Sequence, residues 1–457
     1  MSNLSDPTIY FESLELKNIK CFKGKQLFKL TNDHDNLPAQ WTLILGNNGV
    51  GKTTLLQCLA WMSPVPALHT NQKEIIGIIP AINDAENSEI ERLLRVSRIL
   101  KKATLQDTSL KTIFTLNQSF NNSRQNASMY TEINLSGDVR GKLKSSKPSG
   151  SLGDYHAPLL ITYSANRKQK RGHLGLNFMT LDYSNVFDET TELIDVEAVL
   201  TQMDYASKKG NASEKKKSKN LLDTIRKVLA EILPDLKNNP IRIYGPKLPG
   251  DTGVSGVRFR TPYGEVPLSE LSLGYRTTMG WIVDLAWCLI AKYPDSTTPL
   301  SEAAIVLIDE IDLHLHPEWQ RNLIKKLSDH FPNVQFIATA HSPLMVQSAK
   351  NANLAVLVKE GDHIRIENSP EFLKGWRIDQ ILTSDLFGIP SARSEEVEKK
   401  IIERNRLLKK VDRTLKEQEK LAELDELILD LPTLEAAKDR EILDFIKQAA
   451  EAIKTVR

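Results

Sequence analysis

Residues 46–53 have the types and spacing of a loop that binds phosphate groups. They read GNNGVGKT, which fits the pattern GxxxxGK[ST], and they lie between an apolar segment and a helical one. Glycines let the backbone N–H groups of such a loop turn inward onto phosphate oxygens, and the helix start adds positive potential. We expect Lys52 to reach the terminal phosphates and the Thr53 hydroxyl to bind Mg²⁺. The residues predicted to bind nucleotide are Gly46, Asn47, Asn48, Gly49, Val50, Gly51, Lys52, Thr53 and Thr54.

A second motif supplies two acidic side chains. Residues 304–308 read AIVLI, the composition of a buried strand, and Asp309 and Glu310 follow directly at its carboxyl end. Ligands of open α/β sheets bind at that end of the strands. We expect Asp309 to hold Mg²⁺ together with Thr53, and Glu310 to orient or deprotonate the water that attacks the terminal phosphate. The two motifs together predict hydrolysis of a nucleoside triphosphate.

A third motif narrows the kind of P-loop protein. Residues 271–275, LSLGY, open the helix before the acidic strand and resemble the LSxG signature of ABC-type ATPases. Ser272 lies 37 positions before Asp309, and His341 lies 32 positions after it, at the end of the next strand. About residues 1–370 resemble the ABC-type head ATPases of the SMC, RecF and overcoming-lysogenization-defect group. The segment LKNIKCF at 16–22 resembles their opening strand.

In that family two heads enclose ATP between them. The resemblance implies ATP and Mg²⁺ as cofactors, and it implies that His341 acts in catalysis as the switch histidine that senses the γ-phosphate. It also implies that Ser272 and Gly274 contact nucleotide held by the P-loop of a neighbouring chain, and that Asp312 lies at the shared interface. This chain carries one set of motifs. Two complete sites therefore require at least a homodimer.

The surrounding elements predict an α/β fold with a mixed or parallel sheet. Strands are expected at 41–45, 159–163, 303–308 and 334–339, and two more within 8–30, around the turn Lys23-Gly24-Lys25. Continuous apolarity in the strands at 303–308 and 334–339 indicates burial on both faces. Helices are expected at 52–62 and 317–330, and another over 279–290, where apolar residues recur at helical spacing.

The order of motifs and elements predicts three regions. A discontinuous ABC-type ATPase head occupies 1–164 and 256–370, and a helical insertion lobe with a hairpin occupies 165–255. A helical region occupies 371–457; it serves either oligomerisation or effector docking, or it is a solvated helical cap. Within the lobe, the segment KKGNASEKKKSK at 208–219 has the composition of a mobile connector. Residues 138–153 favour an exposed loop by their Gly, Ser, Pro and Lys content.

The tail holds a dense run of charge. Residues 393–426 include 20 charged side chains among 34, with a thin apolar seam that favours one long helix. Residues 358–362, VKEGD, are better read as a turn than as the opening of a metal-dependent Toprim nuclease, because no DxD follows. No nuclease site is evident in this chain.

Several residues permit two interpretations. His314 and His316 have the spacing of metal ligands, but LHLHP is common after the acidic strand in these ATPases, and Pro317 suits a first helical turn. Lys215–Lys217 favour a solvated surface over a nucleic-acid contact, because no aromatic residues interleave with them. The glutamine loop of the family is either at Gln118 or at 163–167, where Arg167 either reaches phosphate or lies on the surface.

Composition limits the setting of the protein. Sixty basic and 58 acidic residues give a net charge of +2, so nucleic-acid binding is possible but not indicated. The cysteines, Cys21, Cys58 and Cys288, include no CxxC pair, which fits a reducing cytoplasm. We expect no leader peptide and no membrane span, because the apolar run at 281–291 is short and contains Asp284.

An ATPase head without an effector domain resembles the ATPase subunits of bacterial anti-phage systems, those of Septu most closely and those of PARIS as near neighbours. The resemblance implies a homo-oligomer beyond a dimer that controls a separately encoded nuclease effector of the HNH type. Two alternatives stay open. One is a RecF-like repair ATPase that binds DNA across the dimer, and the other is a scaffold that binds ATP without turnover.

Overall fold

The computed structural model describes residues 8–33, 35–68, 75–80, 108–117, 127–135, 142–145, 159–169, 191–233, 236, 240–245, 254–349, 351–368, 376–384, 393–410 and 412–429. The strands are β1 Thr8–Ile19, β2 Phe22–Lys29, β3 Trp41–Leu45, β4 Pro64–Leu68, β5 Ile75–Pro80, β6 Thr108–Asn117, β7 Ala127–Leu135, β8 Lys142–Ser145, β9 Leu160–Tyr163, β10 Arg167–Gln169, β11 Thr191–Leu193, β12 Ile241–Tyr244, β13 Gly256–Thr261, β14 Gly264–Val266, β15 Ala304–Ile308, β16 Val334–Thr339, β17 Asn353–Glu360 and β18 His363–Asn368. The helices are α1 Lys52–Trp61, α3 Val196–Lys208, α4 Ala212–Ile232, α5 Leu273–Lys292, α6 Pro317–His330, α7 Pro343–Ser348, α8 Ile378–Leu382, α9 Glu395–Lys409 and α10 Leu415–Leu429. Two compact units divide the chain, Met1–Gly388 and Ile389–Arg457.

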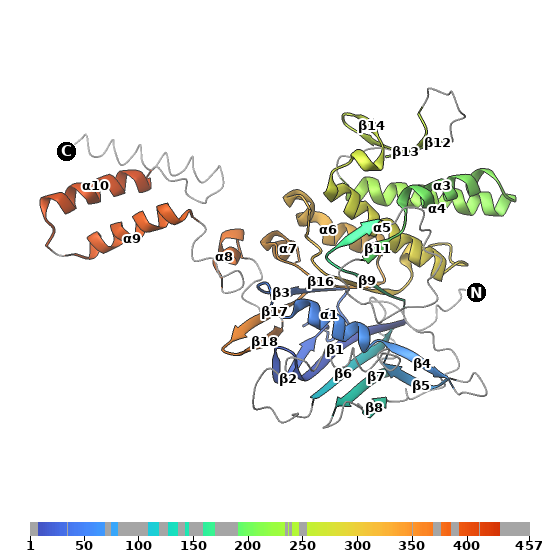
Figure 1. The fold of residues 1–457 in the computed structure, drawn as a ribbon, viewed down its shortest axis with the longest axis horizontal. Coiled ribbons are helices and arrows are strands. Elements are labelled where there is room, and N and C mark those ends of the chain that lie inside the picture. Colours follow the sequence, from blue (N-terminus) through green and yellow to red (C-terminus); the bar gives the residue numbers. More distant parts are fainter. Residues whose placement is uncertain are drawn as a thin grey trace. The chain divides into compact units, whose positions relative to one another are not determined.

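An 11-stranded mixed sheet organises the first unit, in the order β8-β7-β6-β1-β2-β18-β17-β3-β16-β15-β9 (Figure 1). From β17 to β9 the neighbouring strands run parallel, whereas β8, β7, β6, β1 and β2 form an antiparallel half. The predicted α/β class with a mixed sheet is therefore confirmed. Parallel order brings the carboxyl ends of β3, β16, β15 and β9 to one edge of the sheet.

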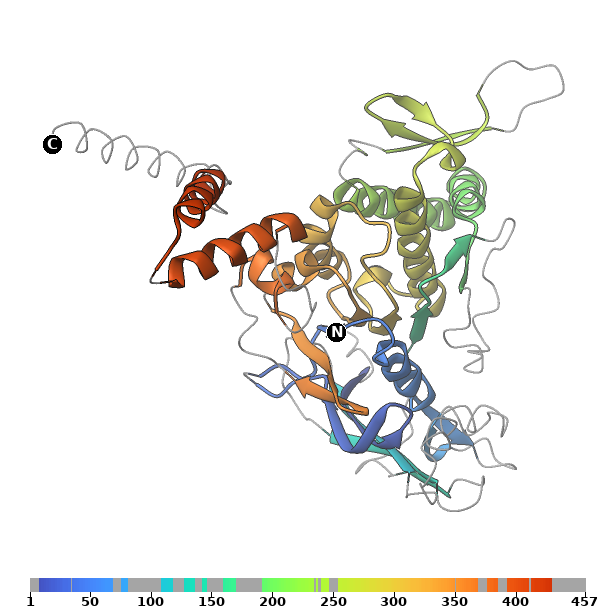
Figure 2. The ribbon, with the colours of Figure 1, turned by 60° about the vertical axis from the view of Figure 1, so that its left-hand side comes forward.

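The parallel strands are buried on both faces, as their apolar runs predict. In β15, Val306 and Ile308 belong to the core under α5, α6 and α7, whereas Ile305 and Leu307 belong to the core under α1. Every residue of β3, β15 and β16 is buried. Figures 1 and 2 show α1 on one side of the sheet and α5, α6 and α7 on the other. Helices on both faces hold the parallel strands rigidly in place, which fixes the loops that follow them.

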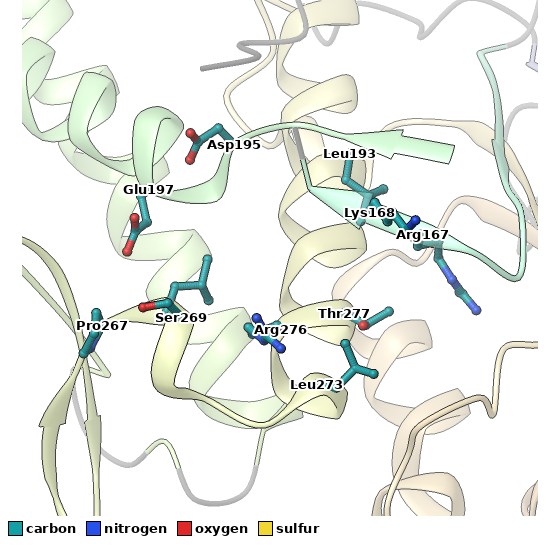
Figure 3. A pocket seen from close by; sticks show the side chains of 11 residues that line it. Arg167, Lys168, Leu193, Asp195, Glu197, Pro267, Ser269, Leu273, Arg276 and Thr277 are labelled. Carbon is teal, nitrogen blue, oxygen red and sulfur yellow. The ribbon is translucent and has the colours of Figure 1, made fainter. Parts of the chain in front are cut away.

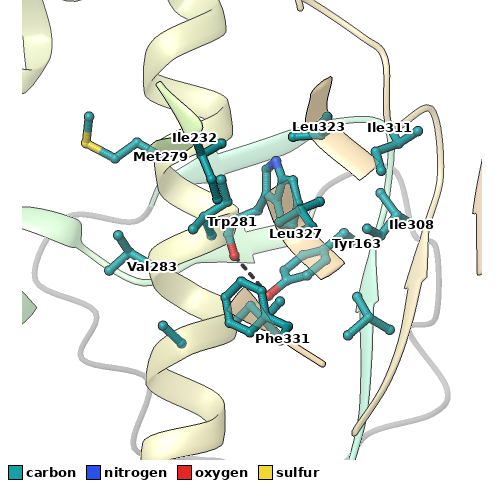
Figure 4. Close-up of a cluster of buried hydrophobic side chains, with 14 of the residues drawn as sticks. Tyr163, Ile232, Met279, Trp281, Val283, Ile308, Ile311, Leu323, Leu327 and Phe331 are labelled. Atoms are coloured by element: carbon teal, nitrogen blue, oxygen red, sulfur yellow. Dashed lines mark hydrogen bonds between the residues drawn. The ribbon is translucent and has the colours of Figure 1, made fainter. Parts of the chain in front are cut away.

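Aromatic side chains fill the core between β9, α5 and α6 (Figure 4). Trp281 and Phe331 are almost fully buried there, and Tyr163 donates a hydrogen bond from its hydroxyl to Trp281 O at 3.3 Å. The same hydroxyl lies 2.8 Å from Asp284 Oδ2, so the acid that interrupts the apolar helix α5 is paired inside the core. This arrangement removes the cost of burying a polar group without a partner.

The insertion lobe is a helical hairpin that continues through the segment expected to be a connector. Residues 212–219 are helical, and the break between α3 and α4 is confined to 209–211. Asn211 and Glu214 form a capping box that starts α4, because each side chain accepts from the other residue's backbone N–H. Lysines on an exposed helical face need no apolar partner. The prediction of a mobile connector at 208–219 is therefore wrong.

Two further sequence-based boundaries differ from the structure. The turn in the first hairpin is at Lys20–Cys21, and Lys23-Gly24-Lys25 lie within β2. The loop predicted at 138–153 contains β8, which pairs with β7, and its other residues lie outside the described ones. The turn predicted at 358–362 is confirmed, because β17 and β18 meet there as an antiparallel hairpin. Strands β12, β13 and β14 form a small antiparallel sheet.

The second unit contains α9 and α10, and the expectation of one long helix is wrong. Helix α9 ends at Lys409 and α10 begins at Leu415. Before α10, the Thr414 hydroxyl accepts from Glu417 N and the Glu417 carboxylate accepts from Thr414 N at 2.9 Å. This is a second capping box, and the sequence pattern Thr-x-x-Glu is typical of it. Arg404 pairs with Asp425 between the two helices, and Leu421 and Leu424 are buried.

The region boundaries near 165, 255 and 371 stay predictions. Among the described residues, no helix is long and apolar enough to cross a membrane.

Candidate nucleotide-binding site

The P-loop joins β3 to α1 and requires glycine at two points. Gly46 has a φ of +144° and Gly51 a φ of +95°, conformations that other residues rarely adopt. A Cβ at Gly46 would lie 2.9 Å from Leu357 O, and one at Gly51 would lie 2.6 Å from Cys21 Sγ. Gly49 also has a positive φ, of +77°, but open space surrounds it. At both ends of the loop, the backbone lies so close to neighbouring residues that a side chain would not fit. This close approach keeps the loop compact at the start of α1.

The side chain of Lys52, the first residue of α1, folds back onto the P-loop. Its ammonium donates to Gly46 O at 2.8 Å and to Asn47 O at 2.9 Å, and its side chain is buried. Burial lowers the pKa of Lys52, while the carboxylates of the acidic segment 309–312 oppose that shift. Asn47, Asn48 and Gly49 are exposed around the ammonium. The positive charge therefore lies inside the curve of the loop, where terminal phosphates would bind.

Thr53, Asp309 and Thr339 form a continuous chain of hydrogen bonds. The Thr53 hydroxyl donates to Asp309 Oδ2 at 2.8 Å, and the Thr339 hydroxyl donates to Asp309 Oδ1 at 2.6 Å. The Thr339 hydroxyl also accepts from Glu310 N at 2.7 Å. Asp309 is buried. The predicted P-loop and acidic motif thus meet, with Thr339 as a link that the motifs did not indicate.

The donor set fits Mg²⁺ bound with phosphates and waters. Thr53 and Asp309 supply one hydroxyl and one carboxylate at the same point. Among the described residues, no group of three or more histidine, cysteine or acidic side chains is placed to hold a metal ion. Mg²⁺ is usually held by one or two carboxylates plus substrate oxygens, in contrast to an all-protein cage.

Glu310 directly follows Asp309 in a strained conformation. Its φ is +49°, in the left-handed region that non-glycine residues seldom occupy. Its backbone N–H is held by Thr339, and its carbonyl accepts from Arg167 Nη2 at 2.7 Å. Such strain persists only where surrounding contacts enforce it, and it is frequent at functional sites.

Of the two roles that the sequence left open for Arg167, the surface position is wrong, and a contact with phosphate stays a prediction. Arg167 is 8% exposed, and its Nη2 donates to the carbonyls of Asp309 and Glu310. Burial lowers the pKa of Arg167 to about 10, and the carboxylates of Asp309 and Glu310 oppose that shift. Gln118 lies outside the described residues.

Asp312 and His341 lie together beyond the acidic pair. The buried carboxylate of Asp312 accepts from His341 N at 2.9 Å, which joins the loop after β15 to the loop after β16. Gln320 braces the same segment, because its side chain donates to Leu315 O at 3.1 Å and accepts from the Ser342 hydroxyl at 2.6 Å. We call the P-loop, residues 309–312 and residues 339–341 the catalytic edge.

Ser272 and Gly274 lie in a different place, which we call the signature corner: residues 272–275 and 314–319. Ser272 is the N-cap of α5, so the motif opens that helix as predicted. A Cβ at Gly274 would lie 2.4 Å from His314 O, so the signature packs directly on the segment LHLHP. A cavity of about 630 Å³ opens here, and no P-loop residue lines it. One chain therefore brings the catalytic edge together but leaves the signature apart from its own P-loop.

The two histidines of LHLHP have structural positions. His316 is the N-cap of α6, and its Nδ1 accepts from Glu318 N at 3.3 Å. Pro317 is the first residue of that helix, as predicted. His314 has a φ of +64° and is exposed. The interpretation that these histidines are not metal ligands stays a prediction.

Comparison with known protein families identifies the family to which the chain belongs. A family model described as "AAA domain" matches residues 13–241, half of the sequence. The chain belongs to this AAA-domain family. A second AAA-domain model, whose description adds an AbiEii toxin of a type IV toxin–antitoxin system, matches residues 182–346. The family and the mixed sheet together show a P-loop domain of the AAA type on an α/β fold.

Curated relatives come from bacterial retron and Septu systems. The chain is 25% identical over 394 residues to "Retron Vc95 probable ATPase" of Vibrio cholerae serotype O1 biovar El Tor, covering 75% of this chain and 73% of that protein. It is 24% identical over 388 residues to "Septu protein PtuA" of Bacillus mycoides, covering 83% of this chain. The match spans 45% of that Septu protein, less than half its length. The resemblance to Septu is confirmed, whereas the sequence motifs gave no indication of retron relatives.

Solved structures of similar fold include an SMC head domain from Thermotoga maritima. The identity is 13%, the TM-score is 0.41, and the match covers 78% of this chain and 98% of that one. The relatives do not favour the RecF-like alternative.

Proposed function

We propose that this chain is the ATP-binding and ATP-hydrolysing regulatory subunit of a bacterial anti-phage defence complex. The observation that carries the hydrolytic part is the hydrogen-bonded chain Thr53–Asp309–Thr339–Glu310 N at the catalytic edge. It joins the P-loop hydroxyl, the acidic strand and the neighbouring strand at the place where the terminal phosphates of ATP would lie.

The residues divide the chemistry among them. Backbone N–H groups of the P-loop and the Lys52 ammonium bind the phosphates. Thr53 and Asp309 would hold Mg²⁺, which would supply neutralisation of the phosphate charge. Glu310 orients or deprotonates the attacking water, and His341 senses the γ-phosphate from the adjacent loop. Because Glu310 is fixed at both backbone groups, its side chain requires little reorganisation before the reaction.

The complete site is built from two chains. The signature corner is open beside Ser272 and Gly274, and no P-loop residue of the same chain lines its cavity. A second copy supplies the missing half, so that Ser272, Gly274 and Asp312 contribute to nucleotide bound by the partner. A C2 arrangement completes two sites at once. The homo-oligomer extends beyond this dimer through the helical region 371–457.

The regulated partner is a separately encoded nuclease effector of the HNH type, restrained or released by the nucleotide state in the cytoplasm. The kinship with "Septu protein PtuA" and "Retron Vc95 probable ATPase" supports a defence role. Because the sequence analysis predicts no nuclease site in these residues, the proposal assigns cleavage to a separate chain.

Replacing Glu310 by Gln tests the hydrolytic role. Phosphate release by Glu310→Gln should fall by about two to three orders of magnitude, because the base is lost while the charge-binding groups remain. Binding of ATP should persist, and light scattering should show an ATP-stabilised dimer. Glu360→Gln is the matched control, since Glu360 is an exposed carboxylate in a hairpin and pairs with Arg365. Equal phosphate release by wild type and Glu310→Gln would contradict catalysis by Glu310.

Copurification with the nuclease encoded beside the gene tests the regulatory role. The complex should form with the full chain, and its DNA cleavage should differ between the ATP-trapped Glu310→Gln protein and the nucleotide-free protein. Identical cleavage in both states would refute control by nucleotide while leaving the ATPase assignment intact. Salt-sensitive binding of DNA by the isolated ATP-bound chain would instead support the RecF-like alternative.

A further inference from the structure

Arg167 is a buried cation whose position needs an explanation. It is the first residue of β10, and its side chain is 8% exposed, while the adjacent Lys168 is exposed. Within the described part of the chain, no carboxylate forms an ion pair with Arg167, and its buried Nε has no hydrogen-bond partner. An arginine in such a place costs desolvation energy that only strong compensating contacts offset.

Those contacts are backbone carbonyls of the catalytic edge. Arg167 Nη2 lies 3.1 Å from Asp309 O and 2.7 Å from Glu310 O, so one nitrogen bridges two successive carbonyls. Hydrogen bonds from a charged donor are stronger than neutral ones. The guanidinium therefore fixes the backbone on both sides of the Glu310 Cα, the atom from which the proposed catalytic carboxylate extends.

Without these contacts, the strained backbone at Glu310 would relax. Glu310 has a φ of +49°, which costs on the order of 1 kcal/mol or more for a non-glycine residue. Thr339 holds the Glu310 N–H, and Arg167 holds its carbonyl, so the two contacts grip the strained residue from opposite ends. Loss of the Arg167 contact would let the backbone turn toward an ordinary conformation and carry the Glu310 side chain with it.

Arg167 also connects this segment to the start of the insertion lobe. Strand β10 pairs in parallel with β11, which is followed by Asp195, the N-cap of α3. Arg167 lies on the wall of a cavity of about 650 Å³ that Asp195, Glu197 and Arg276 also line. Figure 3 shows the Arg167 side chain turned away from Asp195 and Glu197.

We propose that Arg167 is a positioning residue for Glu310, which holds the catalytic carboxylate in its working geometry without touching nucleotide. The inference rests on the proposed ATPase function. It predicts that loss of Arg167 slows the chemical step and leaves nucleotide binding intact.

The first experiment separates binding from turnover in the full-length protein. Arg167→Ala should lower kcat for ATP by about 10- to 100-fold, the effect expected from a misplaced reacting group. KM and the affinity for a non-hydrolysable ATP analogue should change by no more than about threefold. Lys168→Ala is the matched control, because it removes a cation from the same strand at an exposed position. Its kinetics should equal those of the wild type.

Chemical rescue gives a readout that a merely structural role would not produce. Removal of the Arg167 side chain leaves a guanidinium-shaped space on the cavity wall. Millimolar guanidinium or ethylguanidinium should fill that space and raise the kcat of Arg167→Ala severalfold, with no effect on wild type or Lys168→Ala. In a Glu310→Gln background, Arg167→Ala should cause no further loss, because the group that it positions is absent.

The outcomes distinguish this inference from the proposed function. If the wild type fails to hydrolyse ATP, the proposed function is wrong. If the wild type hydrolyses ATP and Arg167→Ala has the same kcat, or loses nucleotide affinity in proportion to kcat, the positioning role is overturned. If circular dichroism shows that Arg167→Ala is unfolded, Arg167→Lys takes its place in the experiment, because it keeps the charge but loses the guanidinium. An intermediate kcat with unchanged KM supports the role, and a wild-type kcat refutes it.

Discussion

The catalytic edge and the signature corner belong to the same head but differ in how completely one chain builds them. At the catalytic edge, Thr53, Asp309 and Thr339 are bonded to one another, and the nearby acidic segment is braced by Arg167. At the signature corner, Ser272 caps its own helix and Gly274 rests on His314, while a cavity of about 630 Å³ stays open beside them.

This difference separates residues that meet within one chain from residues proposed to act on a partner chain. Sequence motifs identify both kinds in the same way. Residues that must meet in one chain follow neighbouring parallel strands, so the fold itself assembles them. Residues that serve a partner need only a rigid platform and open space, which α5 and the segment LHLHP provide. The proposal of a composite site between two copies follows from that contrast, and mutants of each half test it.

The largest effect is expected when the two halves are broken in separate proteins and then mixed. Lys52→Ala should abolish ATP binding, because it removes the cation inside the P-loop. Gly274→Ala should abolish turnover but not ATP binding, since its Cβ would meet His314 O. A mixed dimer of the two keeps one intact site, so mixing should restore up to about a quarter of wild-type phosphate release.

The mixed sample has a direct control in each variant incubated alone, which should stay inactive at the same total concentration. A mixture of Lys52→Ala with Lys52→Ala,Gly274→Ala also has no intact site and should stay inactive. Failure of the mixed sample, with subunit exchange demonstrated by tagged copies, would mean that the signature does not act in trans.

A smaller effect is expected from a contact within the catalytic edge. Thr339→Val removes the hydroxyl that joins Asp309 Oδ1 to Glu310 N and leaves the shape of the buried strand almost unchanged. The free energy of unfolding should fall by about 1–3 kcal/mol, and kcat should fall about tenfold, because the Glu310 N–H loses its partner. Thr339→Ser keeps the hydroxyl and should retain most of the activity. Chemical denaturation measures the free energy of unfolding, and steady-state kinetics measures kcat. Equal kcat values for Thr339→Val and Thr339→Ser would refute a role of the Thr339 hydroxyl in catalysis.

Most of the catalytic edge could be predicted because its chemistry is local in sequence. The pattern at 46–53 and the apolar strand before Asp309 each identify their residues without knowledge of the fold. Thr339 and Arg167 could not be identified in the same way, because their roles come from contacts made across 29 and more positions. A threonine at the end of an apolar strand carries no motif, and an arginine after a strand ordinarily indicates solvent.

Errors in the fold have a common physical cause. High charge and a lack of apolar residues predict a connector at 208–219, and a thin apolar seam on a charged run predicts one long helix at 393–426. In both cases capping decides where the helix begins: Asn211 with Glu214, and Thr414 with Glu417. Both capping boxes are visible in the sequence as a polar residue followed by glutamate three positions later. Cap residues therefore predict these boundaries better than charge density does.

The smallest effect sharpens the description of the signature corner. His316→Ala removes the N-cap of α6 and should lower the free energy of unfolding by about 1 kcal/mol. His316→Asn should restore that loss, because asparagine is a strong N-cap residue but a weak zinc ligand. Thermal unfolding with and without zinc measures the difference. If zinc stabilises the wild type and neither variant, His316 is a metal ligand after all; if zinc has no effect and asparagine substitutes for histidine, the histidine serves only to start α6 beneath the open cavity.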